Sequence, residues 1–277
     1  MRPLFPTKPL HARHAYPNNR WSPPMSNSPV VVALLAHGKR LGSSVRPTTR
    51  RRKLRGPVAN AFVLGVMLDR SVDAHWAWNA AERIQDLLGD PSDVRALWVR
   101  LVRMERRRLV GFLRYGNGGR VFHRHYKTYA RQLPLAAQHL LDNYDGDPRR
   151  MWNDTHDVTA VRARIDAIPG IGMALSRMAV LMLARDYGVL GGRAALPHLD
   201  VKPDIHVVRV FRRCGFTPRG ASRLDVVAVA QKLHPAFPAA LDAPAFNLGR
   251  TWCRPTRPKC TDCPLYPVCP RIGLATL

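Results

Sequence analysis

Four of the five cysteines lie close together near the end of the 277-residue chain, and they are the side chains best suited to hold a metal. Four thiolates at Cys253, Cys260, Cys263 and Cys269 can bind Zn²⁺ or a [4Fe–4S] cluster, and their spacing alone does not distinguish the two. A single group at the end of a large chain does not resemble a disulfide framework. The fifth cysteine, Cys214, is expected to be a small buried residue of a helix.

A glycine-rich turn, Ile-Pro-Gly-Ile-Gly at residues 168–172, lies between two predicted helices. Backbone N–H groups at the start of the second helix would attract a phosphate, and glycine lets a phosphate approach without a Cβ in the way. An isolated turn of this kind is usually a plain helix connection. The candidate phosphate-binding residues are Gly170, Ile171, Gly172 and Ala174.

Asp204 follows Pro203 and opens a predicted helix. Backbone amides and the helix dipole favour a charged carboxylate at such a position. Taken alone, the position is that of an ordinary helix N-cap.

Together, three ordered motifs resemble the helix-hairpin-helix DNA glycosylase superfamily, in its endonuclease III-like branch. They are the turn at 168–172, the segment Asp-Ile-His-Val-Val-Arg-Val at 204–210, and the cysteine loop from Gly249 to Cys269. The resemblance covers roughly residues 58–270 and implies a [4Fe–4S] cluster, rather than zinc, on the four cysteines. It also implies that Asp204 is catalytic, since a fixed carboxylate can stabilise positive charge on a sugar or orient the attacking water.

The resemblance gives further roles to single residues. Ala174 stands where strand-cleaving members carry a lysine, and alanine cannot form a Schiff base, so hydrolysis without strand cleavage is expected. Lys202 is the nearby amine that would contradict this, and we expect it to be solvated. Arg70 aligns with the family's glutamine wedge, which fills the gap left by a flipped base. A surface arginine is the competing interpretation.

The aromatic segment around residue 125 aligns with the family's base pocket. There, His125 and Tyr126 suit a flipped base through hydrogen bonding and stacking. Core packing for the tyrosine and a solvated basic loop for the histidine are the alternatives.

The net charge of the chain is +25, and residues 58–277 alone carry +13 because the first 57 residues hold twelve basic residues and no acid. Such a charge attracts polyanions, and double-stranded DNA is the expected partner. Residues 1–57 are interpreted as a disordered basic arm. An organellar transit peptide, or a true start at Met25, are alternatives for this segment.

Helical periodicity recurs through residues 58–277, and no segment shows the alternation typical of a strand, so an all-α fold is predicted. We expect two helical lobes, a six-helix lobe at 73–186 and a cluster lobe built from 58–72 plus 187–277. No apolar run reaches the roughly 18 residues of a membrane span, and a cytoplasmic, nucleoid-associated monomer is expected. Helices are predicted at 60–68, after Asp73, after Ser92, and at 126–143, 158–167, 173–186, 205–213 and 224–233.

The function expected from these features is that of a monofunctional DNA glycosylase acting on a flipped base in duplex DNA. A glycosylase that also cleaves the abasic site is one alternative. A non-catalytic helix-hairpin-helix DNA-binding protein is the other.

Overall fold

A computed structural model describes residues 25–42 and 54–274, and within these ranges the chain is all-α, as predicted. The only extended pairing among the described residues is an isolated bridge between Asn117 and Arg120. No helix in these ranges has the length and apolar character needed to cross a membrane.

The first hydrophobic core surrounds α2 (Gly56–Leu68), whose residues from Ala59 to Leu68 are all buried. Because α2 has no polar face, other helices must cover it on several sides. A buried hydrogen bond from the Trp98 indole to the Asn60 side chain, at 2.9 Å, joins α2 to α4. The surrounding elements are α3 (Ala74–Leu88), α4 (Ala96–Arg103), α5 (Arg106–Tyr115), α6 (Tyr126–Tyr144), η1 (Pro148–Met151), α7 (Val158–Asp166), α8 (Met173–Met182), η2 (Leu183–Tyr187) and η3 (Gly192–His198).

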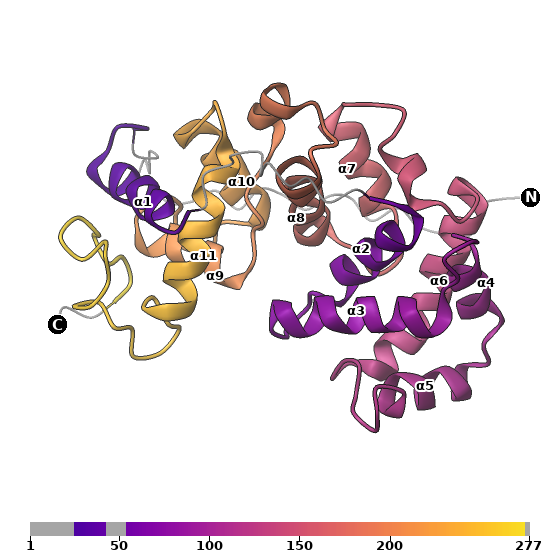
Figure 1. The fold of residues 1–277 in the computed structure, drawn as a ribbon. Coiled ribbons are helices and arrows are strands. Elements are labelled where there is room, and N and C mark those ends of the chain that lie inside the picture. Colours follow the sequence, from indigo (N-terminus) through magenta and orange to yellow (C-terminus); the bar gives the residue numbers. More distant parts are fainter. Residues whose placement is uncertain (1–24, 43–53, 275–277) are drawn as a thin grey trace, which may run out of the picture.

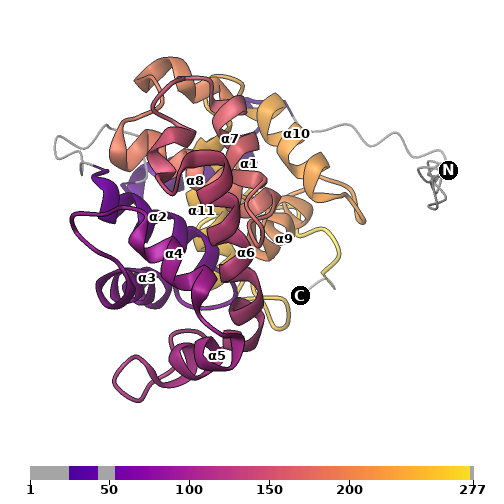
Figure 2. The same cartoon turned by 90° about the vertical axis from the view of Figure 1, so that its right-hand side faces the viewer.

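The second core packs α9 (Ile205–Arg213) against α11 (Asp242–Thr251), with α10 (Arg223–Leu233) and η4 (Pro238–Leu241) beside them. In Figure 1 this group lies at the left with the cysteine loop in yellow, and α2 to α6 lie at the right. In Figure 2, turned by 90°, α5 and its following loop project at the bottom, as they do in Figure 1. The two cores therefore lie side by side.

The second core also contains α1 (Pro29–Arg40), which the sequence analysis placed in a disordered arm. That prediction is wrong for this segment, because Val31 and Leu34 are fully buried against the second core. His37 is buried too, and its Nε2 lies 2.9 Å from the side-chain oxygen of Asn247 on α11. Of the rest of the predicted arm, residues 25–28, 41–42 and 54–57 lie within the described ranges, and the others lie outside them.

The division into lobes also differs from the prediction. Segment 58–72 was assigned to the cluster lobe, yet α2 supplies the middle of the first core, and Leu190, Ala195 and Leu199 pack there as well. Apart from Asn60, the sequence of α2 is apolar, which fits a central position better than a position at the boundary between lobes.

Three polar contacts join the two cores. The Lys202 amine lies 2.7 Å from an Asp69 carboxylate oxygen, and Arg250 lies 3.6 Å from Asp73. The nearly fully buried Asp200 contacts arginines of α7 and α8 and also accepts a hydrogen bond from Gln231 on α10, at 2.8 Å. These contacts bring the segment before α9 against the end of α2.

Candidate active site

The hairpin turn is held by its own backbone and by its neighbours. Gly170 has a φ of 96°, and a Cβ there would lie 3.3 Å from Met67 and from the Gln132 side chain, so glycine suits the position for both reasons. The Ile171 amide donates to the Ile168 carbonyl at 3.0 Å, and its side chain is buried. Ile171 is therefore a turn and core residue, and its amide is not free for a phosphate.

The backbone amides that are free to bind a phosphate lie at the N-terminus of α8. Gly172 is its N-cap, is exposed, and has open space where a Cβ would be. No described acceptor takes the N–H groups of Gly172, Met173 or Ala174, as expected for the first turn of a helix. Ala174, which is partly buried, lies in this first turn. Its N–H group and those of the two residues before it are therefore three adjacent donors available to a phosphate.

Asp204 is the N-cap of α9. Its Oδ1 accepts hydrogen bonds from the amides of His206, at 2.8 Å, and Val207, at 2.9 Å. Within the described part of the chain its Oδ2 has no hydrogen-bond partner. The carboxylate is thus fixed by one oxygen and free to interact through the other.

Lys202 is not solvated, contrary to the sequence expectation. Its side chain is 17% exposed, and its amine contacts Asp69 and the Met178 sulfur. Met178 lies on α8 and Asp69 ends α2, so this amine links the hairpin helix to the turn that carries Arg70. An amine engaged in this way must leave its carboxylate partner before it can act as a nucleophile.

Asp242, at the start of α11, lies behind the same segment. Its Oδ1 accepts the Lys202 backbone amide at 2.5 Å. Burial, and secondarily the neighbouring charge of Asp204, raise the pKa of Asp242 to about 7, against the opposing effects of the Lys202 amide and amine and of Arg185. The carboxyl therefore fixes the backbone two residues before Asp204.

Arg70 lies exposed in a tight turn after α2, where its amide donates to the Leu68 carbonyl at 2.7 Å and Ser71 has a φ of 61°. It lines a small cavity of about 70 Å³ together with His125, Thr128 and Tyr129. The structure therefore brings together the predicted wedge and one predicted base-pocket residue from distant parts of the chain.

Tyr126 does not line this cavity. It packs partly buried against the first core, with the Arg114 guanidinium 5.8 Å from its ring centre. Tyr129, one turn further along α6, takes the position instead and donates its hydroxyl proton to the Met67 carbonyl at 2.7 Å. Burial raises the pKa of Tyr129 to about 12, so it remains a neutral donor.

His123 packs against Tyr129, which lines the cavity. It is fully buried, and its ring lies 4.7 Å from the Tyr129 ring in an edge-on arrangement. Its Nδ1 accepts the His125 amide at 3.0 Å, which fixes the start of α6. Burial first, and the charge of His125 next, lower the pKa of His123 to about 4, so its ring is neutral near pH 7.

The cysteine loop is attached to α9 by two arginines that the sequence analysis missed. The Arg209 Nε donates to the Cys253 carbonyl at 2.6 Å, and the buried Arg213 donates to the carbonyls of Arg254 and Pro255 at 2.6 and 3.1 Å. Spacing along the chain gives no signal for such contacts, because the acceptors are backbone carbonyls some forty residues away.

The four cysteines match the donor set of an iron–sulfur cluster in residue type and number. Burial, with added repulsion from the charges of the other three thiolates, raises the pKa of Cys263 to about 11. A bound cation would relieve that repulsion. In the described residues, however, no three His, Cys, Asp or Glu side chains are grouped closely enough to hold a metal ion.

Cys214 is buried, as predicted, but it also contacts this loop. A hydrogen bond from its thiol is the main cause that lowers the pKa of Cys269 to about 6. The fifth cysteine, which is the C-cap of α9, is thus a neighbour of Cys269.

The chain matches no protein-family model and has no significant match among curated proteins. Its fold is similar to that of a non-covalent endonuclease III–DNA complex, with 19% sequence identity, a TM-score of 0.59, and coverage of 86% of this chain and 93% of that one. A trapped endonuclease III–DNA covalent intermediate gives 18% identity, the same TM-score and the same coverage. A thermostable thymine-DNA glycosylase gives 15% identity and a TM-score of 0.50, with 86% and 92% coverage. The chain therefore has the endonuclease III fold, with a helix-hairpin-helix formed by α7 and α8.

Proposed function

We propose that this chain is a DNA glycosylase that hydrolyses the N-glycosidic bond of a flipped base in duplex DNA. The observation that carries the proposal is the fixed carboxylate of Asp204, with one oxygen bonded to two amides and the other open. A fold similar to solved endonuclease III–DNA complexes supports it.

The carboxylate is suited to this bond because departure of the base builds positive charge on the sugar. Two amide hydrogen bonds at the start of α9 hold the Asp204 carboxyl group in one orientation. A group that needs no rearrangement as charge develops stabilises the transition state more than the ground state. The open Oδ2 faces the sugar or orients water in this proposal.

The DNA is held by its phosphates at the N-terminus of α8, where three amides have no acceptor among the described residues. Arg70 fills the gap left by the flipped base, and His125 with Tyr129 lines the base side of that gap. The net charge of +25 supports a duplex partner, and we propose a monomer, associated with DNA in the cytoplasm.

The test is base release by Asp204→Asn on a panel of duplexes carrying oxidised pyrimidines, deaminated bases, mispaired adenine or bulky modified bases. Asparagine is as good an N-cap as aspartate, so folding is expected to be retained. We expect base release to fall by about 10²–10³ while duplex binding stays within twofold. If wild-type protein releases no base from any duplex yet binds them, the non-catalytic alternative replaces this proposal.

Strand cleavage is not expected, because Ala174 offers no amine and Lys202 is engaged by Asp69. Borohydride reduction during turnover should therefore trap no covalent protein–DNA adduct. A trapped adduct that disappears in Lys202→Ala would establish the bifunctional alternative, and Lys39→Ala, which removes an exposed amine on α1, is the control.

We further propose that Cys253, Cys260, Cys263 and Cys269 hold a [4Fe–4S] cluster. When bound, such a cluster cross-links four points of the loop and stabilises it. Arg209 and Arg213 already attach this loop to α9, the helix that Asp204 caps. Arg254, Arg257 and Lys259 lie between the cysteines and would face phosphates.

A further inference from the structure

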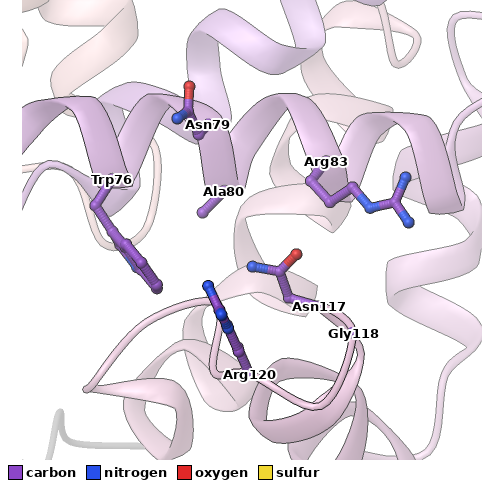
Figure 3. Close-up of a pocket in the computed structure, with 7 residues that line it drawn as sticks. All are labelled: Trp76, Asn79, Ala80, Arg83, Asn117, Gly118 and Arg120. Carbon is purple, nitrogen blue, oxygen red and sulfur yellow. The ribbon is translucent and has the colours of Figure 1, made fainter.

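A second concave site lies on α3, apart from the hairpin. It is a groove of about 570 Å³ between one side of α3 and the loop that follows α5. Figure 3 shows Trp76 directed down from the helix, with Asn117 and Arg120 directed up from the loop into the same space. Asn79, Ala80, Arg83 and Gly118 complete the lining.

The Trp76 ring is fixed by a hydrogen bond and remains accessible to solvent. Its indole donates to the Phe122 carbonyl at 3.1 Å, and the residue is still 40% exposed. Among the described residues no cation is stacked on its face, so the ring offers a free aromatic surface. A ring fixed by a hydrogen bond loses little entropy when a planar group stacks on it.

The charge of the groove is positive and unbalanced. Neither Arg83 nor Arg120 has a carboxylate within ion-pair distance in the described parts of the chain, although Glu82 and Asp86 lie near Arg83 on the same helix. The α5 helix next to the groove adds further exposed cations at Arg106, Arg107, Arg108 and Arg114. The expected ligand is therefore an anion that also carries a flat ring.

We propose that this groove binds an unpaired nucleotide of a DNA strand, with its base on Trp76 and its phosphates on Arg83 and Arg120. An aromatic face beside guanidinium groups is how proteins bind single-stranded nucleic acid without reading sequence. The side-chain amide of Asn117, which is directed into the groove in Figure 3, offers hydrogen bonds to base edges of any kind.

The position of the groove favours DNA. Phe122, whose carbonyl anchors Trp76, precedes His123, which supports the cavity lined by Arg70 and His125. A strand that enters the candidate active site can continue across this loop into the groove. The choice of DNA over RNA rests on the proposed function. The inference that the groove binds a nucleotide does not, because it follows from the aromatic ring and the arginines alone.

The test is the affinity of the full chain for a labelled dT12 strand, measured by fluorescence anisotropy. Trp76→Ala should weaken binding between about 5-fold and 100-fold, and Trp76→Phe, which keeps a stacking ring, should restore most of it. The double variant Arg83→Ala/Arg120→Ala should reduce the slope of log K against log salt by about 1.4. The matched control, Arg223→Ala, removes an exposed arginine on α10 and should leave both quantities unchanged.

Two results would overturn the inference: no binding of dT12 by the wild type, or equal binding by Trp76→Ala in a variant that circular dichroism shows to be folded. Tighter binding of U12 than dT12 would overturn the assignment to DNA. Base release is measured separately on duplexes, so a chain that binds dT12 but releases no base would refute only the proposed function. A chain that releases base but does not bind dT12 would refute only the proposal that this groove binds a nucleotide.

Discussion

The buried carboxyl group of Asp242 should make the stability of the protein depend on pH. This carboxyl lies behind the Lys202–Asp204 segment and accepts the Lys202 amide. Burial and the nearby Asp204 raise its pKa from 3.8 to about 7. The folded chain therefore binds this proton more tightly than the unfolded chain. The contribution of Asp242 to the free energy of unfolding is fully present below about pH 4 and is lost as the pH rises through about 7.

Asp242→Asn removes the titration while keeping an oxygen that can accept the Lys202 amide. The pKa of Asp242 is 3.8 in the unfolded chain and about 7 in the folded chain. When the pH is raised from 5 to 8, the free energy of unfolding of wild type should therefore fall by about 2–3 kcal/mol more than that of the variant. Urea unfolding followed by circular dichroism, at both pH values, measures this double difference. Other titrating groups cancel because they are common to both proteins.

Asp86→Asn removes an exposed carboxylate from α3 and serves as the control, with a pH profile parallel to that of wild type. Parallel profiles for Asp242→Asn as well would refute the reasoning, since they would mean that Asp242 is ionised in the folded chain as in the unfolded one. A steeper profile in the variant would refute even the sign of the effect.

Two other substitutions test the packing around the site. Gly249→Ala places a Cβ 2.7 Å from the Cβ of His206, where α11 crosses α9, and should cost about 1–3 kcal/mol in urea unfolding; an unchanged midpoint would mean that the two helices can separate freely. Cys260→Ser should abolish visible absorbance of the purified protein and lower its melting temperature, as followed by absorbance and calorimetry, and retention of both would contradict the ligand assignment.

The helices that begin with a polar cap were predicted closely from the sequence. Residues 205–213 match α9, and 158–167 exceeds α7 by one residue, because Asp204 and Asp157 accept the first amides of these helices. By contrast, α5 and α11 were not predicted. In the part of the chain that the structure describes, no side chain caps either of them, and α5 is separated from α4 only by Met104 and Glu105.

Within the site, local signals identified the turn and the capping acid but not the contacts between distant segments. The pairing of Lys202 with Asp69 spans 133 positions in the sequence, and nothing local distinguishes a paired lysine from a solvated one. Tyr129 was missed for a similar reason. It is one helical turn beyond Tyr126, and only the packing of α6 against the end of α2 decides which tyrosine faces the cavity.

The boundary between the two cores positions both Arg70 and Asp204. Arg70 follows the last turn of α2 in the first core, while Asp204 precedes the first turn of α9 in the second. Each lies just outside a helix whose buried face fixes its position, so neither depends on a long loop for its place. Lys202 and Asp69 join these two ends directly, one residue from Arg70 and two from Asp204. In the proposed function, where Arg70 is the wedge and Asp204 the catalytic carboxylate, Lys202→Met should therefore weaken the coupling between base flipping and base release, because the Lys202–Asp69 ion pair links the two segments that carry them.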